Sequence, residues 1–508
     1  MPSRTTRVLL ALAVSGMVVG VAGCTGTAQT DDRPTLTKAA AGSVTVAAQD
    51  DAAGRSIRAS RALFASAPGA VVAPADDADA VADAVSAARR AHVPLLLAAK
   101  RDGGAASDGG AASDGGAASA DRPVGAELDR LGASWYQAEG DVQVRTDVPE
   151  RDAPGGGDAP EPSRASRPAT VVVADASADT AVIATAKAAG ARVVTMPDGV
   201  SDPAAAPDVV TALHEHRGAP TLLTGAAFAD LPDPTWTIRA AESGWQLPHG
   251  GQRPFDGHRY VAMYGAPGAP SLGVLGEQDP DASVARAKQL AASYDGVSDE
   301  PVTPAFEVIA TVAAGDAGAD GDYSTELPVS TLEPYVDAAH DAGMPVIIDL
   351  QPGRADFLSQ AKRYESLLKR PGVWLALDPE WRLGPDQVPL QQIGRVDASE
   401  VNAVSSWLAG LVERHGLPPK ALVLHQFRLS MIQDRASLAS YPELDVLIHV
   451  DGQGSQPDKQ ATWKALHDGA PAGVHWGWKN FFDEDQPMLS PAQTMSEVAP
   501  TPSLVTYQ

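Results

Sequence analysis

The second half of the sequence alternates short apolar runs with amphipathic segments, and no other feature restricts the possible folds as strongly. The apolar runs have the length of buried strands. The intervening segments have the periodic apolar residues of helices and often end at a glycine, as at Gly343 and Gly416. Strands that alternate with helices in this way pair in parallel. We expect eight such strands, at residues 260–264, 306–312, 345–349, 373–378, 421–425, 446–450, 473–476 and 503–507.

Eight strand–helix repeats in about 250 residues are what a (β/α)8 TIM barrel requires. We therefore predict an α/β protein in which residues 257–508 form a TIM barrel. An open, doubly wound sheet is the alternative. A chain of 508 residues is too long for one ordinary domain, so further structure is expected before the barrel.

Residues 55–250 also alternate helix-like and strand-like segments, and they predict Rossmann-like parallel α/β units. Two stretches of low complexity, 101–121 and 147–168, interrupt this region and are expected to be loops. The sequence Ala-Pro-Thr-Leu-Leu at 219–223 is similar to Val-Pro-Leu-Leu-Leu at 93–97. The later stretch is therefore interpreted as a diverged second copy or, alternatively, as part of one larger domain.

The first unit carries Val71-Val72 in a strand, Asp79-Ala80 at a helix start and Pro94-Leu95-Leu96 in the next strand, and residues 128–133 continue the pattern. This arrangement resembles the cell wall-binding repeat 2 family. The chain departs from the family at residues 137–141, where the repeats usually have a Gly-Gly turn. The resemblance implies binding to a cell-wall or envelope polysaccharide.

The N-terminus has the layout of a secretory signal, with two arginines followed by an apolar run that is too short to act as a membrane anchor. It closes with Val21-Ala-Gly-Cys24, which resembles the bacterial lipobox, and Cys24 is the only cysteine of the chain. We expect residues 1–23 to be a lipoprotein signal peptide, Cys24 to be lipidated, and residues 24–54 to be a flexible tether. The mature protein would then be extracytoplasmic and anchored to the cell membrane. An ordinary signal peptide with a chance cysteine is the alternative.

The net charge of −25 argues against nucleic-acid binding, because 64 acidic residues oppose 39 basic ones and no basic stripe is present. A single cysteine excludes a disulfide framework and a thiolate zinc site. No glycine-rich phosphate-binding loop follows any expected strand, so we predict no cofactor.

Polar residues stand where the expected barrel strands end, with apolar residues at the alternating positions. Because the carboxyl ends of parallel strands meet at one mouth, these side chains should converge there. They form either a binding or catalytic mouth or a set of strand-end residues with structural partners. The residues are Asp349, Gln351, Asp378, Glu380, His425, His449, Asp451 and His475.

The stretch 373–382 places two carboxylates, Asp378 and Glu380, on one face of the fourth strand. Most glycoside hydrolases use a pair of carboxyl groups in one cavity. We predict Glu380 as the general acid, since Trp381 beside it could raise its pKa by desolvation. Asp378 would orient Glu380 or a substrate acetamido group. The Asp-x-Glu pattern resembles TIM-barrel muramidases and chitinases, which implies peptidoglycan or a similar envelope glycan as substrate.

Three more residues are candidate glycan contacts. Trp476 and Trp478 either stack on sugar faces or pack against outer helices, and Arg354 is a possible contact for an acidic substrate. Whether the barrel is an enzyme stays open, because a non-catalytic glycan-binding lipoprotein would have the same mouth.

A metal-dependent hydrolase is a further alternative. It would use His425, His449 and His475 together with Asp451 or Asp378. The main interpretation assigns no metal.

Overall fold

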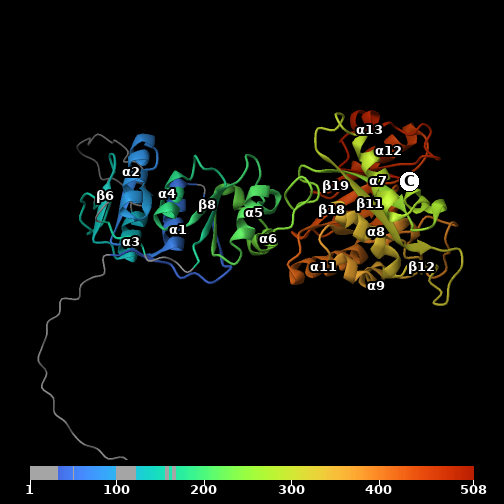
Figure 1. Cartoon of the computed structure of the whole chain (residues 1–508), viewed down its shortest axis with the longest axis horizontal. Helices are drawn as coiled ribbons and strands as arrows, with labels where there is room; N and C mark the ends of the chain where they lie inside the picture. The colour runs from blue at the N-terminus through green and yellow to red at the C-terminus, as the bar shows by residue number, and fades with distance from the viewer. Residues whose placement is uncertain (1–32, 50, 99–121, 143, 155–158, 163–166) are drawn as a thin grey trace, which may run out of the picture.

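The computed structural model describes residues 33–49, 51–98, 122–142, 144–154, 159–162 and 167–508. Figure 1 shows two small α/β units at one end of an elongated molecule and a barrel at the other. The expected signal peptide, Cys24 and the whole of the expected loop at 101–121 lie outside the described residues. None of the helices in the described part of the chain combines the length and the apolar character that a bilayer crossing requires.

The first unit is a three-stranded parallel sheet in the order β5-β4-β6, with its first strand in the centre. β4 is buried along its whole length, as its apolar sequence predicts. Asp77 accepts a hydrogen bond from the Ala80 amide (3.0 Å) and so caps the helix that follows β4. The elements are α1 (Ala52–Leu63), β4 (Gly69–Pro74), α2 (Ala78–Ala91), β5 (Leu95–Ala98), α3 (Arg122–Leu131) and β6 (Trp135–Ala138).

The second unit is a four-stranded parallel sheet in the order β8-β7-β9-β2, with β2 at Val44–Ala47, and β7 lies between β8 and β9 as β4 lies between β5 and β6. The shared position of the central strand favours the interpretation as two copies. The elements are β7 (Thr170–Val173), α4 (Thr180–Ala188), β8 (Arg192–Thr195), α5 (Pro207–Glu215), β9 (Thr221–Thr224) and α6 (Pro234–Ala241).

The expected tether at 24–54 is wrong for the part of it that the structure describes. β1 (Thr35–Leu36) pairs with β3 (Phe64–Ser66), and β2 (Val44–Ala47) pairs in parallel with β9 at the edge of the second sheet. α1 begins at Ala52. Both strands are short, and each is identified by its pairing with a distant strand rather than by its own sequence.

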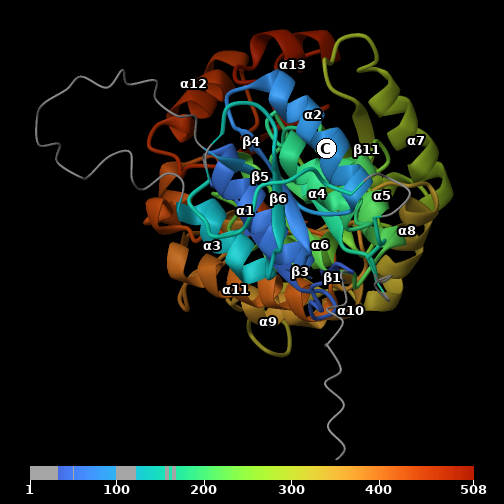
Figure 2. The same cartoon turned by 90° about the vertical axis from the view of Figure 1, so that its left-hand side faces the viewer.

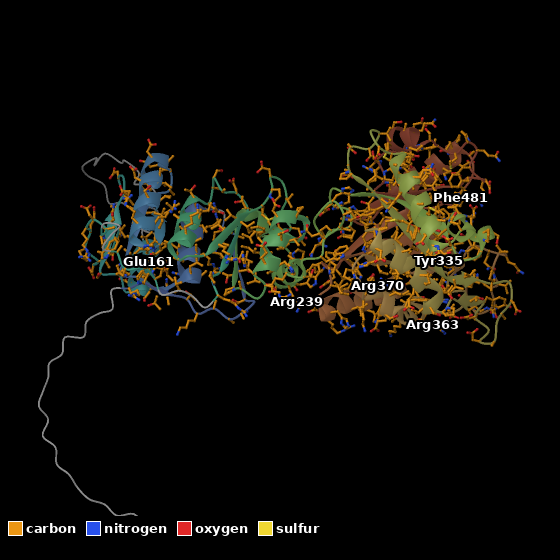
Figure 3. All side chains as sticks on the ribbon, viewed as in Figure 1. Glu161, Arg239, Tyr335, Arg363, Arg370 and Phe481 are labelled. Carbon is orange, nitrogen blue, oxygen red and sulfur yellow. The ribbon has the colours of Figure 1, made fainter. Side chains whose placement is uncertain are left out.

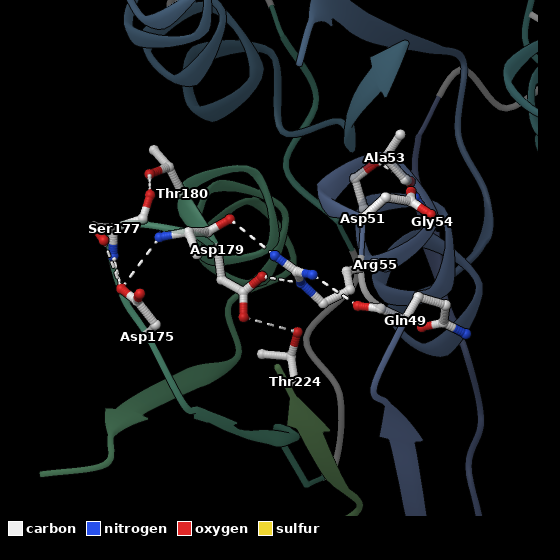
Figure 4. Close-up of polar contacts among 12 residues, drawn as sticks. Gln49, Asp51, Ala53, Gly54, Arg55, Asp175, Ser177, Asp179, Thr180 and Thr224 are labelled. Atoms are coloured by element: carbon white, nitrogen blue, oxygen red, sulfur yellow. Dashed lines mark hydrogen bonds and ion pairs between the residues drawn. The ribbon is translucent and has the colours of Figure 1, made fainter. Parts of the chain in front are cut away.

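A buried ion pair joins the two α/β units where α1 packs against α4 (Figure 4). The Arg55 Nε lies 2.6 Å from Asp179 Oδ1, and both side chains are almost fully buried. Thr224 donates a hydrogen bond to the other carboxylate oxygen of Asp179 (3.2 Å). Figure 2, viewed along the long axis, shows these units in front of the ring of barrel helices.

The C-terminal half is a closed barrel of eight parallel strands, which confirms the predicted fold class. β10 pairs in parallel with both β11 and β20, so the sheet has no open end and the alternative of an open doubly wound sheet is wrong. A short antiparallel strand, β12 (Ser324–Glu326), lies against β11. The barrel strands are β10 (Arg259–Gly265), β11 (Val302–Ala313), β13 (Val346–Leu350), β14 (Val373–Leu377), β16 (Lys420–His425), β18 (Leu444–Val450), β19 (His475–Asn480) and β20 (Leu504–Tyr507).

Helices surround the barrel, as the alternation predicts. The described residues 426–443, between β16 and β18, form short 3-10 turns and strand β17 (Ile432–Gln433) rather than an α-helix. The helices are α7 (Pro280–Ala292), α8 (Val329–Asp341), α9 (Phe357–Arg363), α10 (Glu365–Leu368), α11 (Ala398–His415), α12 (Gln456–His467) and α13 (Pro491–Glu497).

The amino-end face of the barrel is filled with large side chains, and it faces the α/β units. Phe255 packs edge-on against Tyr260, which in turn packs edge-on against Trp374. Trp236 of α6 packs against α11, and the Arg239 guanidinium donates a hydrogen bond to the Glu413 carbonyl (3.2 Å). Figure 3 labels Arg239 between the two parts of the molecule. The carboxyl-end face therefore opens at the end away from the α/β units, near the C-terminus marked in Figure 1.

Candidate functional site

The polar strand-end residues converge inside the carboxyl end of the barrel. Ala376 and Val423 belong to the apolar cluster that fills the barrel interior, and Asp378 and His425 continue the same faces two residues later. A ligand atom from each of Asp378, His425 and Asp451 lies within 4.8 Å of the other two. The side chains form two layers, a fully buried lower one and an upper one that borders a cavity.

His425 is the centre of the lower layer. Its Nδ1 lies 2.8 Å from Asp451 Oδ2, and its Nε2 lies 2.7 Å from Glu307 Oε1. Burial alone would lower the pKa of His425, but the charges of Glu307 and Asp451 raise it well above its usual value. A protonated imidazole donates from both nitrogens, which is the arrangement that two flanking carboxylates require.

The two carboxylates respond in the opposite direction. Burial would raise the pKa of Glu307, yet the charge of His425 and its hydrogen bond lower it to about 2. The same balance of burial against His425 lowers the pKa of Asp451. Asp451 is therefore an ionised carboxylate, and its Oδ1 has no hydrogen-bond partner among the described residues.

Asp349 and Tyr264 form a second buried group beside His425 and its two carboxylates. The Tyr264 hydroxyl donates to Asp349 Oδ2 (3.0 Å) and accepts from the Gln351 side-chain amide (3.1 Å). Burial, partly opposed by His425 and reinforced by Glu307, raises the pKa of Asp349 to about 6. The Lys479 ammonium lies 3.5 Å from the centre of the Tyr264 ring.

His449 lies in the lower layer as a neutral side chain. Burial first, and then the charge of His425, keep its pKa near 3 against the attraction of the carboxylates. Its Nε2 lies 2.6 Å from the Thr506 hydroxyl. Gly477 faces the ring, and a Cβ there would lie 2.4 Å from His449 Cδ2, so the glycine provides the space for this histidine.

Asp378 and Glu380 differ from the expected extended strand. β14 ends at Leu377, and Pro379–Trp381 form a 3-10 turn that Asp378 caps by accepting from the Glu380 amide (3.0 Å). Gly394 donates its amide to the Glu380 carbonyl (2.6 Å), and a Cβ at Gly394 would collide with that oxygen. The turn is thus held from both sides.

Both carboxyl groups of this turn resist ionisation. Burial, together with the charges of Asp349 and Asp451 but against that of His425, raises the pKa of Asp378 well above its usual value. Burial and then the charge of Asp451 raise the pKa of Glu380 to about 7, although Lys479, His425 and Arg428 oppose the rise. Glu380 is therefore a carboxylic acid that can hold its proton near neutral pH beside the ionised Asp451.

A cavity of about 710 Å³ opens above these groups. Of the predicted site residues, Gln351, Asp378, Glu380 and Asp451 line it, whereas Asp349, His425 and His449 lie beneath it. Aromatic rings of Trp381, Phe427 and Phe481 form part of its wall; Figure 3 labels Phe481 in the barrel.

The structure does not place His475 at the mouth of the barrel, where the sequence predicted it. The seventh strand begins at His475 and runs to Asn480, so this histidine lies at the amino end of the barrel, against the Phe255 ring at 4.8 Å. Lys479 takes the mouth position instead. The three-histidine metal site is wrong for the same reason, and both nitrogens of His425 already contact carboxylates.

Trp476, Trp478 and Arg354 also lie outside the cavity. Both tryptophans pack on Trp463 of α12, at 5.9 and 5.6 Å between ring centres, which is the outer-helix alternative. The Arg354 guanidinium stacks over Tyr323 and donates to the Gln387 carbonyl (2.9 Å), so it supports a loop of the rim rather than facing a substrate.

Four residues of the site escaped the sequence-based reasoning. Tyr264 has the pattern of an ordinary buried aromatic residue of a strand. Lys479 lies beyond the end that we expected for the seventh strand, and Arg428 lies in a loop. Glu307 left a usable signal, because it is a single carboxylate within the apolar run Ala305-Phe-Glu-Val-Ile-Ala310. A charged residue inside a buried strand needs a partner.

No family model and no curated protein sequence matches the chain. Among solved structures, Cwp6 from Clostridium difficile is similar at 11% identity with a TM-score of 0.28. The matched region covers 67% of this chain and 63% of that one.

Proposed function

We propose that the barrel hydrolyses an envelope glycan and that Glu380 is its general acid. The observation that carries this proposal is one cavity lined by a carboxylic acid with a pKa of about 7 and by a carboxylate with a lowered pKa, Asp451. Glycosidases need this combination, since one group must give a proton while the other stays charged.

In the proposed reaction Glu380 donates its proton to the oxygen of the scissile glycosidic bond as that bond breaks. The positive charge that develops on the sugar ring is stabilised by the ionised Asp451, a residue that lines the cavity. Water supplies a hydroxyl group to the anomeric carbon, and the remaining proton of that water returns to Glu380. Asp378 positions the acid, because its side chain caps the turn that carries Glu380.

Several features favour a glycan as the ligand. The cavity combines polar groups with the rings of Trp381, Phe427 and Phe481, and sugar faces stack on such rings. The resemblance of the N-terminal units to cell wall-binding repeats and of Val21–Cys24 to a lipobox agrees with a wall or envelope polysaccharide. We propose accordingly an extracytoplasmic protein that is attached to the membrane through Cys24, with residues 55–250 as the wall-binding region.

The test compares purified wild-type protein with the Glu380→Gln variant on peptidoglycan and on chitooligosaccharides. We expect the release of reducing ends to fall about 100-fold to 10,000-fold, the contribution of a general acid. Pull-down of the glycan should be kept, because glutamine has nearly the same shape. Glu365→Gln, in an exposed pair with Lys369, is the matched control and should change neither readout.

Two results would count against the proposal. Binding without turnover in both proteins would leave a non-catalytic glycan-binding barrel. Equal turnover in both would remove Glu380 from the acid role.

A further inference from the structure

We propose that the site is built for an acidic glycan, and that Arg428 binds a carboxylate on a sugar that lies beside Glu380. This inference rests on the proposed function and deepens it. It concerns a second cavity that borders Glu380 on the rim of the barrel.

The second cavity has a volume of about 370 Å³ and adjoins the larger one. Five of its seven lining residues also line the larger cavity: Glu380, Trp381, Leu390, Ile393 and Arg428. Gln391 and Gln392 complete it. Glu380 therefore stands at the junction of two spaces, so a glycan can pass from one to the other with its scissile oxygen beside the acid.

Arg428 is the cation of the smaller cavity. It follows β16 by three residues, and its carbonyl accepts hydrogen bonds from the Gln426 side chain (3.1 Å) and the Met431 amide (3.1 Å), which fix its backbone. Its guanidinium carbon lies 5.7 Å from the centre of the Phe427 ring, but it forms no ion pair with a carboxylate of the described residues, and the residue is exposed. In a chain with 64 acidic residues, a rim arginine that lacks a carboxylate partner is available for a ligand.

The other two cations that border the larger cavity are already engaged. Lys459 forms a buried ion pair with Asp485 at 2.7 Å, and Lys479 is buried with its ammonium over the Tyr264 ring, whereas Arg428 is exposed. Arg428 is thus the group that can accept a new negative charge. A single guanidinium matches a single planar carboxylate, which it can hold through two hydrogen bonds, whereas a doubly charged phosphate usually takes more cations.

The same rim offers an apolar surface to the sugar that carries this carboxylate. Leu390 is 85% exposed and has a left-handed backbone conformation (φ 66°), which is unfavourable for a leucine. Its side chain borders both cavities next to Trp381. An apolar contact beside a free guanidinium suits a sugar with one charged substituent.

The experiment measures binding by calorimetry in the Glu380→Gln background, so that turnover does not interfere. The probes are two disaccharides, N-acetylglucosamine linked either to N-acetylglucosamine or to N-acetylmuramic acid, which differ by one carboxylate-bearing ether. Adding Arg428→Gln should weaken binding of the acidic disaccharide about tenfold or more and leave the neutral one unchanged. Arg363→Gln, on the outer surface of the barrel (Figure 3), should change neither.

The outcomes separate the two proposals. If both disaccharides bind equally and Arg428→Gln affects neither, the carboxylate site is refuted while glycan binding stands. If neither disaccharide binds, the proposed function falls and this inference with it. Displacement of the acidic disaccharide by inorganic phosphate, but not by acetate, would refute the carboxylate in favour of a phosphate group.

Discussion

Replacing Glu307 by glutamine tests the electrostatic core of the site without altering the cavity wall. The glutamine oxygen can still accept a hydrogen bond from His425, so the substitution removes the negative charge and little else. Glu307 does not line the cavity, and its side chain is fully buried against His425 Nε2. The variant therefore reports whether a charged imidazole is held inside this barrel.

The magnitude follows from the pKa of Glu307, which lies at about 2 rather than 4.5. A difference of about 2.5, at about 1.36 kcal/mol for each pKa unit, corresponds to about 3 kcal/mol of stability. Removing one partner of a buried ion pair typically costs about 3–5 kcal/mol, which agrees. We expect Glu307→Gln to lower the free energy of unfolding by about 3 kcal/mol at pH 7.

The sign of the pH dependence is fixed by the direction of the shift. Because the pKa of Glu307 is lowered in the folded state, its stabilisation is present above pH 4.5 and is lost as the pH falls through about 2. The difference between wild type and variant should therefore fall to less than about half at pH 3.

Urea unfolding followed by tryptophan fluorescence measures this difference, with Glu365→Gln as the exposed control, which should leave the midpoint unchanged. Equal stability of wild type and Glu307→Gln at pH 7 would refute the reasoning, since His425 would then be neutral.

Two further predictions concern the pH profile and the α/β units. Turnover of the wild type should fall as the pH rises through about 7, because burial and then the charge of Asp451 raise the pKa of Glu380 to about 7 and a general acid must carry its proton. Initial rates on chitooligosaccharides measure this, and rates that stay constant across this pH range would contradict the assignment. Asp179→Asn should destabilise the α/β units by about 3–5 kcal/mol in urea unfolding, because it removes the carboxylate charge that lies 2.6 Å from the buried Arg55 guanidinium. Asp83→Asn, at an exposed position of α2, should leave the midpoint in place, and equal effects of the two variants would argue that the ion pair is not the cause.

The barrel and the orientation of its polar side chains follow from local patterns. Apolar runs of strand length, separated by amphipathic segments, restrict the chain to parallel α/β structure, and strict alternation within a strand fixes which side chains share a face. This is why Asp349, Asp378, His425, His449 and Asp451 all lie inside the carboxyl end of the barrel.

The seventh strand shows where local patterns fail. The alternation of His475, Gly477 and Lys479 with Trp476 and Trp478 gives the correct parity, but it does not say where the strand starts. Gly473, at a positive φ of 75°, belongs to the turn before the strand, and pairing with β18 begins at His475. The strand starts two residues later than predicted. His475 therefore lies at the amino end of the barrel, and Lys479 lies at the mouth.

The sequence by itself therefore determined the fold class of the barrel and the inward face of each strand, because both depend on neighbours a few residues apart. The tertiary structure decided the chemistry. Whether His425 is charged depends on Glu307 and Asp451, which are 118 and 26 residues away, and whether Glu380 keeps a proton depends on burial and on the charge of Asp451. Protonation and access to the cavity depend on charges and burial around each group, and those are set only when distant strands close into the barrel.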